Sequence, residues 1–325
     1  MNTIAGGNTA SGSFIGGGDE VLIGIGSAFS AIGAGSSNSI SGTGGLYSAF
    51  IGAGNSNAIG SGGSIDAEGA FIGAGSANKI GSTASAPYAF IGAGYQNTSN
   101  ADNTFIGSGQ ANSVSGGYGV IGGGEKNIVS ATYGAVAGGY DNSAIGYEST
   151  VAGGAINTAS STQAFVAGGT SNVAAGADSF AAGYHANAAY TGSFVWSDTS
   201  SSAATKATAA YQFLARAAGG VMFFSNSAMT AGVSLAAGGG SWSNLSDRNL
   251  KTGIALLDND SILDRVAMLP ITEWSYISEP GVRHVGPMAQ DFYAAFGVGE
   301  DNRHITTIDE DGIALAAIQA LHREN

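Results

Sequence analysis

The stretch Phe71–Asn78, with the sequence FIGAGSAN, is one copy of an eight-residue block that recurs along the chain as far as Asn187. Its last position is nearly always asparagine, and the steps between successive asparagines are 19, 21, 19 and then 15 six times running. Six equal steps do not arise by chance, so this part of the chain is a repeat protein. The asparagines are Asn38, Asn57, Asn78, Asn97, Asn112, Asn127, Asn142, Asn157, Asn172 and Asn187.

The first two positions of nearly every block are apolar, and Thr150 is the exception at the first position. The first is phenylalanine in most copies, as in Phe50 and Phe71, and the second is an aliphatic residue. A 15-residue period is too short for a helical hairpin, and the central glycines disfavour helix by up to about 1 kcal/mol each. We therefore expect a mainly β protein in which each unit is one coil of a parallel β-solenoid, rising about 4.8 Å per coil. The aromatic column is expected in its core.

Glycine and asparagine suit the corners of such a coil because both tolerate a positive φ. The stacked asparagines are also expected to form a ladder of side-chain amides. The longer units carry insertions, such as 61–64 and 83–86, which are rich in Ser, Gly, Thr and Ala. We expect these insertions to bulge from one side as loops and to provide variable contacts.

The composition predicts an ordered chain that associates with other copies of itself. Of the 325 residues, 55 are glycine, 10% are charged and 44% are apolar, which is too apolar for intrinsic disorder. A coil with one large apolar residue among many Gly, Ala and Ser positions encloses only a thin core, which hardly offsets the entropy of ordering the chain. Packing of three chains would supply the missing burial, so a homotrimer is expected.

Several classes of function are disfavoured. The net charge of −13 argues against binding to a nucleic-acid backbone. The start of the chain lacks the basic and apolar regions of a signal peptide, and no apolar run is long enough for a membrane span. There is no cysteine, the histidines show no metal-ligand spacing, and no glycine-rich block continues as a phosphate loop. We therefore expect no metal, no cofactor and no membrane insertion.

The blocks between about residues 30 and 190 resemble the head repeats of YadA-like trimeric autotransporter adhesins. That resemblance implies a left-handed parallel β-roll, assembly as a trimer and display on a surface.

Composition changes sharply near Ser246, and three segments are expected. Residues 1–190 form the repeat shaft, 191–245 a β-rich neck with strands near 211–216 and 220–225, and 246–325 a small α+β domain. Segment 246–325 holds 13 acidic and 6 basic side chains, or 19 charges, against 11 charges in segment 1–189. Helices are expected at 260–269, 288–296 and 312–325, with a strand at 271–277; Ala314, Ile318 and Leu321 have the 4-then-3 spacing of a coiled coil.

Three motifs in this last segment occur in the order typical of the endosialidase-type intramolecular chaperone of phage tailspikes and tail fibres, which the segment resembles over its whole length. They are 246–251 (SDRNLK), 284–291 (HVGPMAQD) and 316–321 (AAIQAL). The resemblance places Ser246 and Lys251 on a catalytic Ser-Lys dyad and the scissile bond between Leu245 and Ser246. Further motif residues are taken as supporting, namely Asp247, Arg248, Gly286, Gln290 and Asp291.

The chemistry of such a dyad makes one demand on the fold. A serine hydroxyl is a weak nucleophile, and a lysine activates it only if burial keeps the amine neutral. Lys251 is therefore expected to be desolvated, and neighbouring subunits would couple cutting to correct assembly. Asp247 is expected to cap a turn, and Arg248 to make a surface or intersubunit contact. His284 is expected to be packed or solvated rather than catalytic. Two mechanisms of cleavage remain open, namely direct attack on the bond between Leu245 and Ser246 and an N-to-O acyl shift at Ser246.

The favoured hypothesis is a trimeric fibre protein, of a phage tail or a bacterial surface, that attaches to a receptor on a host or other cell. A carbohydrate is one candidate receptor. Two alternatives remain: an enzyme-bearing spike that degrades polysaccharide, and a C-terminal domain that stays attached as a permanent trimer clamp. The first alternative requires paired carboxylates, and the nine acids of segment 1–189 are scattered.

Overall fold

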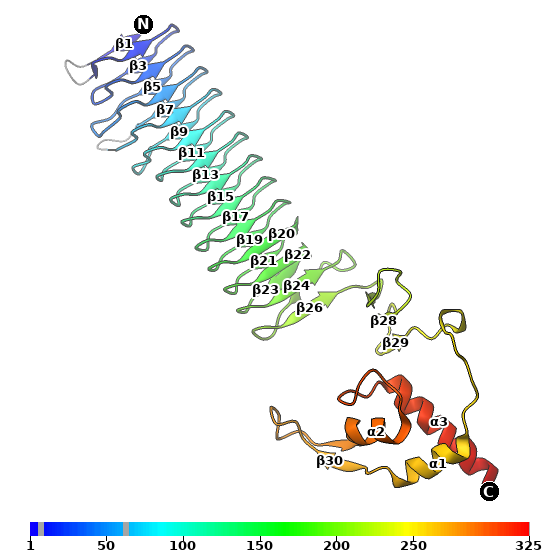
Figure 1. Cartoon of the computed structure of the whole chain (residues 1–325). Helices are drawn as coiled ribbons and strands as arrows, with labels where there is room; N and C mark the ends of the chain where they lie inside the picture. The colour runs from blue at the N-terminus through cyan, green and yellow to red at the C-terminus, as the bar shows by residue number, and fades with distance from the viewer. Residues whose placement is uncertain (6–9, 61–64, 325) are drawn as a thin grey trace. The chain divides into compact units, whose positions relative to one another are not determined.

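The computed structural model describes residues 1–5, 10–60 and 65–324. The chain divides into two compact units, Met1–Ala218 and Gly219–Asn325 (Figure 1). The first unit is a parallel β-solenoid and the second is a small unit of short strands and three α-helices. The predicted fold class, a mainly β solenoid followed by an α+β segment, is confirmed.

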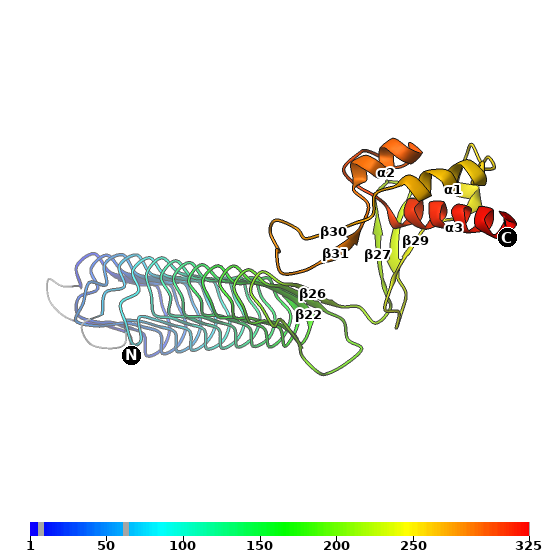
Figure 2. The ribbon, with the colours of Figure 1, turned by 90° about the horizontal axis from the view of Figure 1, so that it is seen from below.

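The solenoid is built from two parallel sheets of thirteen strands each, so that each coil adds one strand to either sheet (Figure 2). The odd-numbered sheet contains β1 (Thr3–Ile4), β3 (Leu22–Ile23), β5 (Ser39–Ile40), β7 (Ala58–Ile59), β9 (Lys79–Ile80), β11 (Thr98–Ser99), β13 (Ser113–Val114), β15 (Ile128–Val129), β17 (Ser143–Ala144), β19 (Thr158–Ala159), β21 (Val173–Ala174), β23 (Ala186–Ala188) and β25 (Thr205–Lys206). The even-numbered sheet contains β2 (Phe14–Ile15), β4 (Ala31–Ile32), β6 (Phe50–Ile51), β8 (Phe71–Ile72), β10 (Phe90–Ile91), β12 (Phe105–Ile106), β14 (Val120–Ile121), β16 (Ala135–Val136), β18 (Thr150–Val151), β20 (Phe165–Thr170), β22 (Phe180–Tyr184), β24 (Phe194–Ser197) and β26 (Phe213–Arg216).

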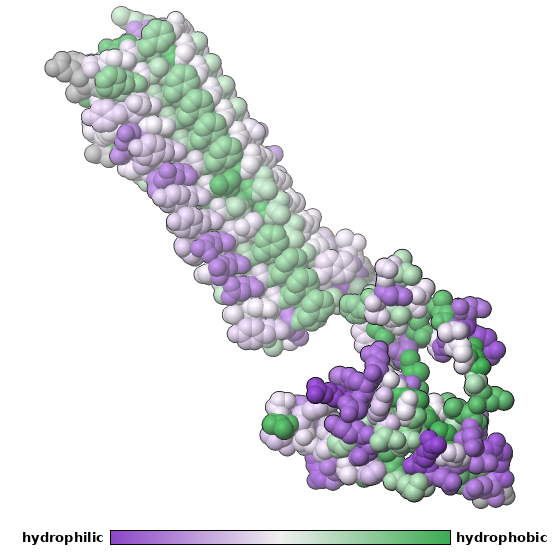
Figure 3. Space-filling view, in the orientation of Figure 1, coloured by the Kyte–Doolittle hydropathy of each residue, from purple (hydrophilic) through white to green (hydrophobic). Residues whose placement is uncertain are grey.

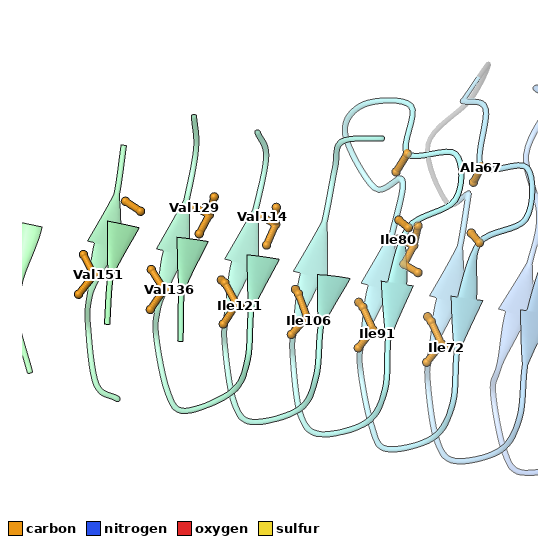
Figure 4. Packing of buried hydrophobic residues seen from close by; sticks show 14 of the residues in the cluster. Ala67, Ile72, Ile80, Ile91, Ile106, Val114, Ile121, Val129, Val136 and Val151 are labelled. Carbon is orange, nitrogen blue, oxygen red and sulfur yellow. The ribbon is translucent and has the colours of Figure 1, made fainter. Parts of the chain in front are cut away.

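In most coils the core is filled by the second residue of each strand, which is usually Ile, Val or Ala, and not by the phenylalanines. Ile51 and Ile106 are fully buried, whereas Phe50 and Phe105 are 37% and 41% exposed. Figure 4 shows the buried Ile and Val side chains between the two sheets. The prediction of an aromatic core is therefore wrong, because successive residues of a strand point to opposite faces and the narrow interior takes the β-branched side chain.

The predicted amide ladder is present and buried. Asn127 Nδ2 lies 3.1 Å from Asn112 Oδ1, 3.0 Å from the Gly123 carbonyl oxygen and 3.0 Å from that of Gly139. The Asn127 backbone N–H also donates to Asn112 Oδ1, at 3.0 Å. The same pattern links the fully buried asparagines from Asn38 to Asn172. Each amide thus ties its own coil to the coils before and after it.

Asn187 does not continue this ladder. Val173 pairs with Asn187, so Asn187 takes the outward position, and Ala186 N–H donates to Asn172 Oδ1 at 2.9 Å in its place. The cause is a register shift between Val166 and Gly168 of β20, after which the coil is one residue shorter. The prediction that Asn187 belongs to the amide ladder is therefore wrong.

The corner glycines permit close backbone approach. Gly54 has a φ of 112°, and a Cβ at this position would collide with the carbonyl oxygen of Gly75 in the next coil. Of the two predicted insertion loops, 61–64 lies outside the described residues. The other lies outside the strands, where Thr83–Ser85 are exposed and Ala86 is fully buried.

The solenoid extends beyond residue 190, where the repeat period in the sequence ends, and stops after β26. Arg216 closes this end: its Nε lies 3.2 Å from Asp198 Oδ1, and its other nitrogens donate to the carbonyl oxygens of Asp198, Ser201 and Ala203. Hydrogen bonds from the Ser200 hydroxyl, the Ala218 N–H and Arg216 lower the pKa of Asp198 from 3.8 to about 2. Of the two strands expected in the neck, the first therefore belongs to the solenoid.

The second unit begins with an antiparallel sheet of β27 (Val221–Phe224), β28 (Gly232–Leu235) and β29 (Trp242–Asn244). A short 3-10 helix, η2 (Arg248–Leu250), follows, and then α1 (Asn259–Met268), the antiparallel pair β30 (Thr272–Trp274) and β31 (His284–Gly286), α2 (Ala289–Phe296) and α3 (Thr307–Glu324). The predicted helices are found, although α3 begins five residues earlier than expected. The hydrophobic core of the second unit contains Ile262 of α1, Phe292 of α2, and Ile313, Ala316 and Ala317 of α3.

We predict that the amide ladder contributes more to stability than an exposed apolar residue beside it. Asn127→Ala should lower the free energy of unfolding by about 3 kcal/mol, because Asn112 Oδ1 and the Gly139 carbonyl lose a buried donor. Ile128→Ala, which truncates a side chain that is 40% exposed, should cost about 1 kcal/mol. Urea unfolding followed by circular dichroism measures both, and equal losses would contradict the ladder's role.

We predict that the Asp198–Arg216 contact stabilises the solenoid only while Asp198 is ionised. Because the folded-state pKa lies below 3.8, the stabilisation is complete above about pH 4 and is lost as the pH falls towards 2. Asp198→Asn should therefore lower the melting temperature at pH 7 and differ little from wild type near pH 2. Asp141→Asn, which changes an exposed acid on a solenoid turn, is the control. A difference in melting temperature between Asp198→Asn and wild type that persists at low pH would exclude ionisation of Asp198 as its cause.

Candidate functional site

The predicted cleavage point lies at the end of a strand. β29 pairs with β28, and the Leu245 N–H still donates to the Gly232 carbonyl oxygen at 3.2 Å. The next residue, Ser246, has left the sheet. The bond between Leu245 and Ser246 therefore joins a paired strand to a turn, and Leu245 is 44% exposed.

The turn after this bond is stabilised by Asp247. The Asp247 carboxylate caps η2 by accepting hydrogen bonds from the Asn249 backbone N–H at 2.8 Å and from the Asn249 side-chain amide at 3.0 Å. The Lys251 N–H closes the turn on the Arg248 carbonyl oxygen at 3.2 Å. This one turn reverses the chain direction, so that residues 246 and 251 can meet.

Ser246 and Lys251 do meet. Lys251 Nζ donates a hydrogen bond to Ser246 Oγ across 2.6 Å. A neutral amine in the same place would accept the proton of the hydroxyl and so generate an alkoxide nucleophile. The spacing of the two atoms therefore suits a nucleophile and its base.

The surroundings of this pair do not supply the burial that the sequence argument requires. Both residues are exposed, as is every described residue from Trp242 to Asp258. Water around an exposed lysine stabilises its charged form. A single chain thus holds the two side chains together and leaves them solvated.

The remaining motif residues lie on a separate part of the unit. Gly286 ends β31, and Gln290 and Asp291 lie in the first turn of α2. Asp291 borders a shallow hollow with Arg265 and Leu269. Among the residues that the structure describes, no hydrogen bond joins this group to Ser246 or Lys251, and Arg248 is exposed with no side-chain partner.

His284 is part of an aromatic cluster. Its ring stacks on Trp274, with centroids 4.7 Å apart, and lies edge-on to Tyr276 at 5.5 Å. His284 Nε2 and Trp274 Nε1 are both buried without a hydrogen-bond partner in the described chain. The packed role expected for this histidine agrees with these contacts.

Asn249 is the residue that the sequence argument overlooked, because it makes both hydrogen bonds to Asp247. An aspartate followed two residues later by asparagine, in a polar segment, is a recognisable turn signal. Across the described ranges 1–5, 10–60 and 65–324, no group of three or more acidic or histidine side chains could hold a metal ion. No helix there is long and apolar enough to cross a membrane.

A comparison with known protein families covers the segment that contains Ser246 and Lys251. Residues 246–298 match the model of the family described as chaperone of endosialidase, Peptidase_S74. No curated protein matches the chain. The match begins at Ser246 and stops before α3, so the third sequence motif lies outside it. Residues 246–298 are thus similar to the endosialidase chaperone, and this similarity, together with the solenoid, fits a tail-fibre-like protein.

Proposed function

We propose that this chain is a trimeric fibre protein whose solenoid serves attachment and whose C-terminal domain guides assembly before it is released by self-cleavage between Leu245 and Ser246. The observation that carries the proposal is the 2.6 Å contact between Lys251 Nζ and Ser246 Oγ at the first residue of the matched family segment. The functional segments that we propose are a shaft at 1–190, a neck at 191–245, whose first part continues the solenoid as far as Arg216, and a released domain at 246–325.

Cleavage needs no external substrate. With Lys251 neutral, Ser246 Oγ attacks the carbonyl carbon of Leu245, and the hydroxyl proton passes to Nζ. The C–N bond breaks as the Ser246 nitrogen takes up a proton, which leaves an ester that water hydrolyses to a Leu245 carboxylate and a Ser246 amino terminus. A water molecule activated by the same amine would give identical products by direct attack.

The exposed position of the pair supports a link between cleavage and assembly. Neighbouring chains would cover Lys251, remove its water and favour the neutral amine. The third helix offers a surface for such neighbours, because Leu315 and Ile318 are 62% and 61% exposed on the face opposite its buried alanines. A correctly assembled trimer would then cut itself, and a single chain would not.

Attachment is the role that remains for the solenoid, whose repeats support a surface-displayed rod of the YadA-like kind on a virion or a bacterial cell. A receptor on the host or other cell, with carbohydrate as one candidate, is the partner this role requires. A polysaccharide-degrading spike and a domain that is never released remain the alternatives.

We predict that wild-type chains are cut and that Ser246→Ala and Lys251→Met chains stay whole. Losing the nucleophile or its base should slow cleavage by at least about a thousandfold. Intact mass identifies the cut, and Ser243→Ala, which removes a hydroxyl from nearby β29, is the control expected to cut normally. If wild type also remains uncut in a native-mass trimer, the domain is a permanent clamp.

We predict that the exposed face of α3 is required for assembly. The double variant Leu315→Ser with Ile318→Ser should lose the trimer and cleave at least about tenfold more slowly, because no neighbour then buries Lys251. Glu310→Ser, on the same helix, should do neither. Native mass reports assembly and intact mass reports cutting; efficient cutting by monomers would refute the link.

A further inference from the structure

The outer face of the even-numbered sheet carries a column of aromatic rings, interrupted at Ala31 and from Val120 to Thr150. Its strands begin with phenylalanine in nine of thirteen cases, and we call these residues the phenylalanine stripe: Phe14, Phe50, Phe71, Phe90, Phe105, Phe165, Phe180, Phe194 and Phe213. Figure 3 shows a hydrophobic band that runs along the solenoid.

Neighbouring rings of the stripe stack on one another. The centroids of Phe71 and Phe90 are 5.0 Å apart with planes 2° apart, and those of Phe90 and Phe105 are 5.2 Å apart at 3°. Stacking covers the ring faces and leaves the ring edges outward. The stripe is therefore an ordered apolar ridge and not a set of independent side chains.

The odd-numbered sheet has no such column. Its equivalent outward positions carry no aromatic residue in any of the thirteen strands; Lys79, Thr98 and Ser113 are typical. The two sheets share one backbone geometry and one repeat, so the fold itself does not require the rings. Something that contacts only the even-numbered sheet must account for them.

The residues that follow the stripe along each strand are small and uncharged. From Phe14 to Phe180, each stripe position is followed by an aliphatic residue and then by Gly, Ala or Ser, as in Gly92 and Ala93. Depletion of charge is typical of the centre of a protein interface, and small residues allow a second backbone to approach. The strip thus has the composition of a buried contact.

Its size agrees with that interpretation. The exposed fractions of Phe50, Phe105 and Phe165 lie between 36% and 41%, those of Phe14 and Phe213 are 62% and 68%, and the other four rings are half-buried. On side chains of roughly 200 Å² each, the nine rings together present on the order of 600 Å² of apolar surface. A monomer rarely leaves more than a few hundred Å² open, and each partner in a stable interface contributes about 800 Å².

We propose that the phenylalanine stripe is the contact between copies of this chain, which lie parallel and in register with their even-numbered sheets turned towards a common axis. The partner has to match a ridge that has a ring in nine of the thirteen coils, with the same gaps and the same rise, and a second copy has both. A receptor at one point of the shaft would not require rings in so many coils. This proposal rests on the proposed trimer and specifies which face builds it.

The chain contains no cysteine, so single thiols can test the proposal in the full-length protein. Phe90→Cys places one thiol in the stripe, and Thr98→Cys places one on the odd-numbered sheet of the same coil, equally half-buried. Oxidation and a short bis-maleimide should join up to about two thirds of the Phe90→Cys chains into pairs, since one thiol of three is left over. Thr98→Cys should give none, and peptide mapping should show a 90-to-90 link.

The outcomes separate the contact face from the trimer itself. A native-mass trimer in which only Thr98→Cys cross-links, or neither variant does, overturns the stripe contact and leaves the trimer standing. A native-mass monomer of wild type overturns both proposals, while cleavage is still read separately from intact mass. Circular dichroism matched to wild type shows that each variant is folded.

Discussion

Parallel stacking of the coils at strand spacing is the constraint on which the rest of the solenoid depends. Because each strand pairs in register with the strand one coil away, a position in the repeat becomes a column along the whole unit. A residue that suits one coil must therefore also suit its neighbours above and below. The Ile and Val column, the asparagine ladder and the phenylalanine stripe are three results of this single rule.

The aliphatic column and the asparagine ladder stabilise the solenoid in different ways. The aliphatic column provides hydrophobic burial, while the asparagines satisfy backbone carbonyls at the corners, which a thin core would otherwise leave unpaired. Where the coil loses one residue near Gly168, Ala186 replaces an asparagine and the ladder ends. Beyond that point Arg216 and Asp198 hold the last coils together by a charged network.

The second unit follows different rules, and its site reflects them. The contact of Ser246 with Lys251 arises locally, from one capped turn, so it needs little support from the rest of the unit. What the turn cannot provide is removal of water. The turn brings Ser246 and Lys251 together, and removal of water has to come from elsewhere. With that division, assembly of the chains would be able to control cleavage.

The sequence alone determined the parallel solenoid, the ladder from Asn38 to Asn172, and the positions of all three helices, because periodicity and helical spacing are local properties that survive without knowledge of packing. Its resemblance to the endosialidase-type chaperone also indicated Ser246 and Lys251, a choice that the spacing of two such residues would not have justified by itself. Only the tertiary structure decided that Ile51 faces inward and Phe50 outward, because two adjacent apolar residues carry no sign of which side is the core. The tertiary structure also decided that the solenoid continues to Arg216, since strand pairing can persist by backbone hydrogen bonds after the side-chain period has ended.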